Sequence, residues 1–430
     1  MQRRVIQVEE KVPFLQGLPL SFQHLFAMFG ASVLVPFLFN NAAGKQVVDP
    51  ALVLLMNGIG TLLFIFVGKG RAPAFLGSSF AFLAPTFAIM ASSSDAGLNY
   101  SKALGGFVLS GVLFVVIAFI ISKVGTGWLD VILPPAAMGP IVALIGLELA
   151  GTAADMAGLF PKEGVYNTNA IIVSMFTLLV VVLGSILFRG FFSVIPVLVA
   201  VVAGYVLSAL MGVVDYSAIG QKDWLVIPQF VLPVFDINAM MIIAPATLVV
   251  LSEHIGHIFV TSNIVGRDLA KDPGLHRTLF SDGFSTALSG LMGSVPTTTY
   301  GENMGVMAIT KVYSVWVIGG AGLISIIIAF FGKLSGVISS IPVPVMGGIS
   351  ILLFGVIAAS GIRMLVESKI DYSKSKNLIL TAVVFVAGVS GVAINIGQVP
   401  LKGMALATVV GMLLSLVFYI FEKLNVTNEA

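Results

Sequence analysis

GSVPTTTYGENMGVMAIT, residues 293–310, cannot form one regular helix, although it lies in a strongly apolar chain. Pro296 has no backbone N–H, three threonines follow it, and Gly301 weakens any helix. The apolar run 300–310 that follows would make about 16 Å of helix, half the thickness of a bilayer. Irregular backbone at membrane depth is tolerated only where it is buried in protein or lines a cavity. This stretch therefore predicts a broken membrane segment beside a binding site.

The composition is that of a membrane protein. Of the 430 residues, 58% are hydrophobic and 10% are charged, whereas a soluble domain carries about 25% charged residues. A bilayer of about 30 Å requires apolar helices of about 20 residues. We therefore predict an all-α polytopic fold with fourteen membrane segments. The predicted segments lie at residues 20–39, 51–68, 72–91, 103–123, 131–150, 168–187, 190–212, 239–262, 278–293, 300–310, 313–331, 341–361, 376–396 and 402–421.

The distribution of basic residues supports this count. With a cytoplasmic N-terminus, 16 of the 22 Lys and Arg residues fall on the cytoplasmic side, where positively charged loops concentrate. We therefore expect a multi-pass protein, surrounded by membrane lipid, with both termini cytoplasmic. The chain has no cysteine, which excludes disulfides and Cys-ligated metal sites. We expect no cofactor and no nucleic-acid partner.

Repeated motifs indicate an internal repeat. Three pairs recur in the same order: QHLFAMFG (23–30) with EHIGHIFV (253–260), GSSF (from Gly77) with GSVP (from Gly293), and PPAAMGPIVAL (134–144) with PVPVMGGISIL (342–352). Fourteen segments divide into seven and seven, and an odd number in each half gives the halves opposite orientations. Inverted repeats with broken helices in corresponding positions are typical of secondary transporters, whose substrates bind at the breaks.

Residues beside the two breaks are candidate site residues. Glu302 follows one break, where a helix beginning near Gly301 would leave free N–H groups that recognise carbonyls or anions. The alternative is an outside loop in which Glu302 is an acid at a helix start. Phe80 follows the other break, so its N–H corresponds to those near Gly301, and its ring could stack on a flat ligand. An ordinary packed phenylalanine is the alternative there.

Glu253 and His257 are four residues apart and share one face of a helix. A carboxylate at this depth must pair, take up a proton or bind a ligand, and His257 can hold or relay a proton. A structural hydrogen bond between the two is the alternative. The order EHIGH does not match the HExxH zinc motif, so we expect no metal. We interpret Gln23 and His24 as packing polar residues, and we assign no function to Asp282, which lies nearer a segment end.

These motifs together resemble the nucleobase/ascorbate transporter family, also called nucleobase:cation symporter-2. The family signature has Gln, Glu or Pro followed by N-x-G-x4-T, and here it reads Glu302-Asn303-Met304-Gly305 and then Thr310. Other stretches resemble the uracil-carrying bacterial members: FQHLFAMFG, LGSSFAF, GTGWLDVILPPAAMG, EHIGH, DPGLHR and TTYGENMGVMAIT. The likeness runs from about residue 3 to residue 424.

The resemblance implies a fold of 7+7 inverted repeats, with short antiparallel β-strands in the broken segments 3 and 10. It also implies a core domain of segments 1–4 and 8–11, and a gate domain of segments 5–7 and 12–14. The corresponding divisions are a cytoplasmic N-terminus (1–19), core (20–123), gate (124–238), core (239–331), gate (332–424) and a cytoplasmic C-terminus (425–430).

The resemblance further implies symport of uracil with a proton across the bacterial cytoplasmic membrane, by alternating access of the core against the gate domain. Homodimers occur in the family. The implied substrate-binding residues are Phe80, Glu253, Gly301, Glu302, Tyr300, Ala31 and Phe354. The implied proton-coupling residues are His257 and Glu253.

Uracil suits such a site, because it is flat and neutral and has two N–H donors and two C=O acceptors. Two carboxylates can accept from the donors, while two backbone N–H groups donate to the carbonyls. A symporter for another nucleobase, such as xanthine, uric acid or thymine, and a channel-like nucleobase facilitator are the alternatives. An anion carrier should not place two acids at its site. The sequence offers no activated nucleophile or metal set, so we do not expect an enzyme.

Overall fold

The computed structural model describes residues 5–161, 163–220, 222–396 and 399–427. The ends 1–4 and 428–430, which belong to the predicted cytoplasmic termini, lie outside the described residues. The elements of the first half are α1 (Phe14–Ala43), α2 (Pro50–Val67), β1 (Leu76–Ser78), η1 (Phe80–Phe82), α3 (Leu83–Met90), α4 (Ala96–Val124), α5 (Gly127–Ile132), α6 (Pro135–Glu148), α7 (Ala150–Met156), α8 (Thr168–Leu187), η2 (Gly190–Val194), α9 (Pro196–Leu210) and α10 (Ser217–Gly220). Those of the second half are α11 (Ile237–Val265), η3 (Ala270–Gly274), α12 (Leu275–Met292), β2 (Thr297–Thr299), α13 (Gly301–Thr310), α14 (Val315–Ala329), α15 (Gly332–Ser339), α16 (Val343–Glu367), α17 (Ser375–Val389), β3 (Ala393–Ile396), β4 (Val399–Lys402) and α18 (Gly403–Lys423).

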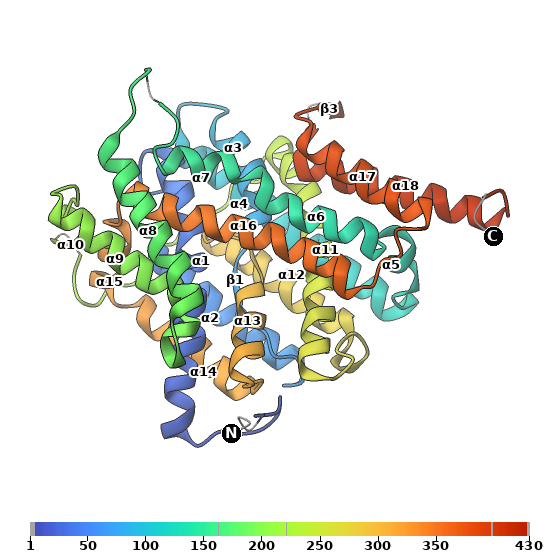
Figure 1. Ribbon diagram of the computed structural model, residues 1–430, viewed down its shortest axis with the longest axis horizontal. Coiled ribbons are helices and arrows are strands. Elements are labelled where there is room, and N and C mark those ends of the chain that lie inside the picture. Colours follow the sequence, from blue (N-terminus) through green and yellow to red (C-terminus); the bar gives the residue numbers. More distant parts are fainter. Residues whose placement is uncertain (1–4, 162, 221, 397–398, 428–430) are drawn as a thin grey trace.

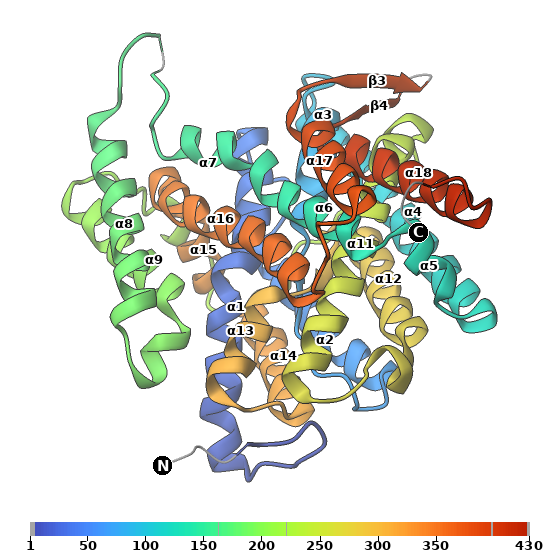
Figure 2. The ribbon, with the colours of Figure 1, turned by 45° about the vertical axis from the view of Figure 1, so that its right-hand side comes forward.

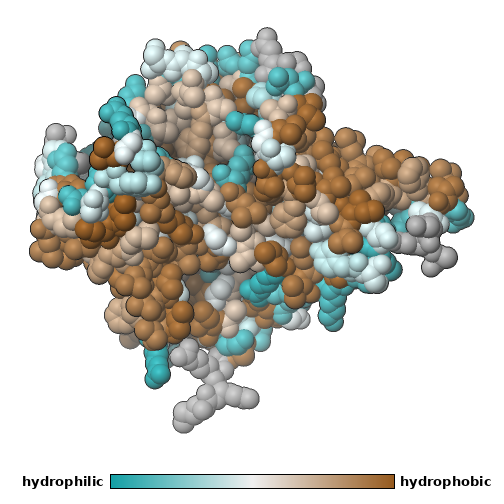
Figure 3. Space-filling model, turned by 45° about the horizontal axis from the view of Figure 1, so that its top comes forward, coloured by the Kyte–Doolittle hydropathy of each residue, from teal (hydrophilic) through white to brown (hydrophobic). Residues whose placement is uncertain are grey.

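The helices have the length and surface of membrane segments. Within the described residues, eight helical segments are long and apolar enough to cross a bilayer. Shorter apolar helices lie at Phe80–Met90, Pro196–Leu210, Val315–Ala329 and Ser375–Val389. Large apolar side chains such as Phe66 and Leu210 are exposed, and Figure 3 shows apolar residues over much of one face. The chain is a helical membrane protein, and the count of fourteen crossings stays a prediction.

The helices pack closely where glycines face each other. α4 packs against α12 and α11, and α2 packs against α14; α16 packs against α6 and α8, and α17 packs against α18. A Cβ added to Gly111 of α4 would lie 2.5 Å from the Gly283 carbonyl oxygen of α12. One added to Gly361 of α16 would lie 2.4 Å from the Gly139 carbonyl oxygen of α6. Contacts between small residues let helix backbones approach each other in lipid.

The two broken segments meet near the centre of the molecule, where β1 and α13 lie (Figure 1). β1 and β2 pair antiparallel, with Leu76 opposite Thr299 and Ser78 opposite Thr297. The predicted strands in segments 3 and 10 are therefore confirmed. A second antiparallel hairpin, which was not expected from the sequence, pairs β3 with β4 beside α17 and α18 (Figure 2).

A segment at the N-terminus, residues 5–10, adds a further extended pairing that we call the N-terminal strap. Ile6 exchanges two backbone hydrogen bonds of 2.9 Å with residues 311–313, directly after α13. Glu9 accepts a hydrogen bond from Arg267, which follows the end of α11. The strap thus joins the ends of two helices that carry candidate site residues.

Candidate functional site

The crossing of β1 and β2 is buried and continues beyond the strands. The Ser79 N–H donates to the Pro296 carbonyl (2.8 Å), and the Tyr300 N–H donates to the Phe75 carbonyl (3.2 Å). Proline cannot donate in a helix, and β-branched threonines favour extended backbone, so Thr297–Thr299 form the strand β2 directly after Pro296. The chain leaves the crossing as η1 and α3 on one side and as α13 on the other.

Each of these helices begins with an unpaired backbone donor. Neither Ser79, before η1, nor Tyr300, before α13, caps its helix through the side chain. The first N–H groups of a helix have no partner within that helix. Within the described part of the chain, the N–H groups of Phe80 and Gly301 donate to no protein acceptor. The crossing therefore presents two backbone donors, one from each half of the chain.

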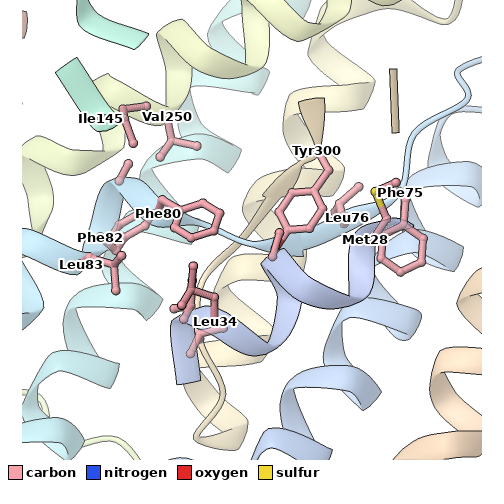
Figure 4. Close-up of a cluster of buried hydrophobic side chains, with 14 of the residues drawn as sticks. Met28, Leu34, Phe75, Leu76, Phe80, Phe82, Leu83, Ile145, Val250 and Tyr300 are labelled. Atoms are coloured by element: carbon pink, nitrogen blue, oxygen red, sulfur yellow. The ribbon is translucent and has the colours of Figure 1, made fainter. Parts of the chain in front are cut away.

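Aromatic rings lie against the crossing. A Cβ on Gly77 would lie 2.3 Å from two Tyr300 ring atoms, so the ring rests on bare backbone at the β1 glycine. The Tyr300 hydroxyl donates to the Ser78 carbonyl (3.1 Å). The Phe80 ring meets the Phe354 ring of α16 edge to face, with centroids 5.8 Å apart. Figure 4 shows the rings of Phe80 and Tyr300 beside β1.

Glu253 and His257 lie on α11 and are both buried. His257 Nδ1 lies 3.0 Å from Thr299 Oγ1, and a Cβ on Gly301 would lie 3.7 Å from His257 Nε2. The imidazole thus links α11 to the end of β2 and the start of α13. No hydrogen bond joins His257 to Glu253 among the described residues, so the alternative of a structural Glu–His bond is not observed. Glu253 Oε2 is buried and has no partner there either.

Glu302 lies in the first turn of α13 and is half-buried. It lies within electrostatic range of Glu253. The next residue, Asn303, is buried, and its Oδ1 lies 3.0 Å from Nδ1 of His24 in α1. His24 therefore packs as a buried polar residue, as predicted, and its partner is on the helix that carries Glu302. Gln23 is also buried.

A buried histidine–aspartate pair, which was not expected from the sequence, lies next to these residues. His254 Nδ1 lies 2.9 Å from Asp282 Oδ2, His254 Nε2 lies 3.1 Å from Thr278 Oγ1, and the Thr298 hydroxyl is 3.4 Å from Asp282. Asp282 lies in the middle of α12 and not near a segment end, because α12 begins at Leu275. The hydroxyl-rich stretch LFSDGFSTALSG, residues 279–290, is the sequence feature that could have indicated a buried polar cluster around Asp282.

The remaining candidates lie nearby. Ala31 is buried in α1, and its neighbour Ser32 accepts a hydrogen bond from Ser78 of β1 (2.9 Å). Phe354, on α16, reaches the site through its contact with Phe80. The site thus combines carboxylates, which accept hydrogen bonds, with backbone N–H groups, which donate them, and with aromatic rings. Such a set can bind a flat, neutral molecule that has both donors and acceptors.

The fold and these motifs define a membrane transporter. The chain belongs to the Permease family, whose model matches residues 15–397. This is the nucleobase/ascorbate permease family that the motifs predict, so the protein is a multi-pass membrane transporter and not an enzyme.

Individual relatives are similar over the full length. The uracil permease of Escherichia coli strain K12 is 57% identical over 426 residues, which cover 99% of this chain and 96% of that protein. The uracil permease of Paenibacillus larvae is 54% identical over 433 residues and 100% of both chains. The transmembrane domain of a cyanobacterium bicarbonate transporter, BicA, has the same fold, with a TM-score of 0.60 at 16% identity over 96% of this chain and 99% of that chain.

Proposed function

We propose that this protein is a proton-coupled uracil symporter that imports uracil across the bacterial cytoplasmic membrane. The observation that carries the proposal is the convergence at the strand crossing of two carboxylates, Glu253 and Glu302, with the unpaired N–H groups of Phe80 and Gly301. The similarity to proteins named uracil permease, at 54% and 57% identity, favours uracil among the nucleobases.

In the proposed binding mode, the two carboxylates accept hydrogen bonds from the two uracil N–H groups. The Phe80 and Gly301 N–H groups donate to the two uracil carbonyls, and Ala31, Tyr300 and Phe354 complete the pocket wall. Each polar group of uracil then has one partner. A molecule that lacks one of these groups leaves a buried donor or acceptor unpaired, which can cost up to about 10⁴-fold in discrimination.

We propose Glu253 and His257 as the proton-coupling residues. Glu253 is buried, and its Oε2 has no hydrogen-bond partner among the described residues, so the carboxyl group can change protonation as the substrate binds and leaves. His257 contacts Thr299 and lies beside Gly301, where it senses whether the start of α13 is occupied. Both residues stand on one face of α11, one turn apart.

We further propose that a core of α1–α4 and α11–α14 moves against a gate of α6–α9 and α16–α18. Two hollows on the seam between these sets support the proposal. One, of about 240 Å³, lies between α11 and the helices α6 and α16, and Gly256, Met138 and Met364 line it. The other, of about 30 Å³, lies between α3, α11 and α18, where Pro85 and Met404 line it.

Uptake into proteoliposomes tests the function. We expect labelled uracil to accumulate when the external solution is made acidic, with thymine, xanthine and cytosine as competitors. A protonophore should abolish accumulation but leave uracil exchange. Uptake that is unaffected by the protonophore and does not saturate would instead favour a channel. Stronger competition by xanthine or thymine than by unlabelled uracil would assign another nucleobase.

A disulfide between α11 of the core and α16 of the gate, across the seam between them, tests the proposed domain motion. A Cβ on Gly256 of α11 would lie 3.9 Å from Met364 Cγ of α16, the position that the sulfur of a cysteine at residue 364 can occupy, so two introduced thiols would face each other across the seam. The natural chain has no cysteine, so the pair Gly256→Cys and Met364→Cys can be oxidised without background. We expect oxidation to stop transport, reduction to restore it, and each single variant to be insensitive to both. Full transport by the completely oxidised pair would contradict the proposed domain motion.

A further inference from the structure

An apolar groove lies away from the candidate site, on the outside of the helices α1, α2 and α14. It has a volume of about 970 Å³, and Leu18, Leu62, Phe66, Leu323 and Ile327 are among the residues that line it. Phe66, Leu323 and Ile327 are each more than half exposed. Figures 1 and 2 both place α14 beside α1 and α2. We call this hollow the α2–α14 groove.

The length of the groove matches one leaflet of a bilayer. Along α14 it runs from Trp316 to Ile327, about 16 Å at 1.5 Å per residue. Half of a hydrocarbon core of about 30 Å is 15 Å. The groove is therefore long enough to hold a lipid acyl chain along α14.

Small residues form the floor of the groove. A Cβ on Gly319 would make only ordinary contacts, 3.5 Å from Ile65 Cδ1 and 3.8 Å from Leu62 Cδ2. A Cβ on Gly320 would lie 2.3 Å from Ser21 Oγ, so α1 packs directly on α14 there. The missing side chain at Gly319 accounts for the depth of the groove, because a larger residue at that position would fill it.

Two lysines stand at the end of the groove nearest the N-terminus. Lys11 Nζ lies 4.7 Å from the centroid of the Trp316 ring, and Lys69 follows α2 in a turn fixed by its N–H bond to the Phe66 carbonyl (3.1 Å). Within the described part of the chain, neither ammonium group has a carboxylate partner. Glu9, which also lines this end, is paired with Arg267.

We propose that the α2–α14 groove is a binding site for an anionic phospholipid of the leaflet that faces the N-terminus. One acyl chain lies along α14 over Gly319, and the headgroup phosphate contacts Lys11 and Lys69. Charge complementarity selects the anionic headgroup, since basic residues near the surface of a bilayer attract acidic lipids. Trp316 lies at the boundary between chain and headgroup, where tryptophan is commonly found.

Native mass spectrometry of the delipidated full-length protein tests this site. The probes are phosphatidylglycerol and phosphatidylcholine with identical acyl chains. We expect phosphatidylglycerol to bind about thirtyfold more tightly, from the combined effect of two lysines. The double variant Lys11→Ala and Lys69→Ala should lose this preference. Gly319→Leu should weaken the binding of both lipids, because it fills the groove.

Lys123 offers a matched control, since its ammonium group also lies over an aromatic ring, that of Phe119, at 5.6 Å. Lys123→Ala should bind both lipids as the natural chain does. The proposal is overturned if the double-lysine variant keeps the full preference for phosphatidylglycerol, if Lys123→Ala loses it equally, or if Gly319→Leu binds both lipids unchanged. Thermal unfolding in the same detergent verifies that each variant is folded.

Discussion

The two broken segments present the same backbone at the strand crossing but different side chains. Each passes from a short strand into a helix, and each offers an N–H there, at Phe80 and at Gly301, that has no acceptor in the described part of the chain. The first segment adds the apolar ring of Phe80 and no charged side chain. The second adds Glu302 and Asn303, and His257 contacts its strand at Thr299.

This difference separates two contributions to the proposed site. The repeat supplies one backbone donor from each half, so the donors come as a pair and depend on the strand crossing. The charged side chain at a break occurs in the second half alone. Changes to the crossing should therefore disturb both halves, whereas changes to side chains should act on the second half.

Gly77→Ala should have the largest effect, because it disturbs the crossing itself. The added methyl group would lie 2.3 Å from the Tyr300 ring, and the ring would have to leave its place over β1. Such overpacking costs about 1–3 kcal/mol, so we expect the affinity for uracil to fall by up to about a hundredfold. Calorimetry of the purified protein measures the change.

Gly305→Ala is the matched control for this change. A Cβ on Gly305 of α13 would have no neighbour within 4 Å. It should therefore bind uracil as the natural chain does. Natural affinity in Gly77→Ala would show that the close contact with Tyr300 is not needed for the site.

His257→Ala should remove coupling more than binding. One proton that crosses 100 mV supplies about 2.3 kcal/mol, enough for roughly fiftyfold accumulation of a neutral base. We expect the variant to lose this accumulation, because His257 is the proposed proton-coupling residue on α11. Exchange of uracil between equal pools should be retained better. Parallel measurements of uphill uptake and exchange in proteoliposomes give the comparison.

Thr299→Val distinguishes a proton-coupling role of His257 from a purely structural one. It removes the hydrogen-bonding partner of His257 Nδ1 and leaves the imidazole in place. Coupling should survive in this variant at least in part. If His257→Ala and Thr299→Val lose uphill uptake and exchange to the same degree, His257 is only a structural partner of β2.

Glu302→Gln should weaken uracil binding at least about tenfold, because an acceptor oxygen becomes a donor that faces a uracil N–H, and a buried unsatisfied group costs about 1–3 kcal/mol. The first broken segment has no carboxylate that could compensate. Calorimetry is again the measurement, with the exposed loop variant Glu163→Gln as control. Unchanged affinity would remove Glu302 from the site.

Glu9→Gln should have the smallest effect, since it changes only the N-terminal strap that joins the ends of α11 and α13. The hydrogen bond from Arg267 holds the pKa of Glu9 below its ordinary value. The stabilisation is therefore present above the ordinary pKa of the carboxyl and is lost as the pH falls through the lowered one.

An exposed ion pair contributes less than about 1 kcal/mol, so we expect a small decrease in thermal stability at pH 7 that disappears in acid. Uracil affinity at pH 7 should not change. A loss of affinity in Glu9→Gln would show that the strap acts on the site.

The sequence predicts the features of this fold that depend on local backbone chemistry. Pro296 and the three threonines predict the break, and the short run after Gly301 predicts a half-length helix, which is α13. The strands themselves were expected only from the family resemblance. A four-residue spacing places Glu253 and His257 on one helix face.

Contacts between distant segments could not be predicted in this way. The partner of His257 is Thr299, and that of His254 is Asp282, each on a different element. A single sequence shows which residues share a helix face but not which helix lies opposite. The β3–β4 hairpin and the pairing of the N-terminal strap were not predicted for a second reason. Short extended segments carry little periodic signal in the sequence.

The pairing of β1 with β2 also constrains how the chain is made. Ser78 and its partner Thr297 are 219 residues apart. At about 5–20 residues per second, the ribosome needs roughly 10–45 s to synthesise the second strand after the first. During that interval the N–H and C=O groups of β1 have no strand partner, and such groups are costly in lipid. The first half of the transporter must therefore wait in a sheltered environment, such as the insertion machinery, until the second half arrives.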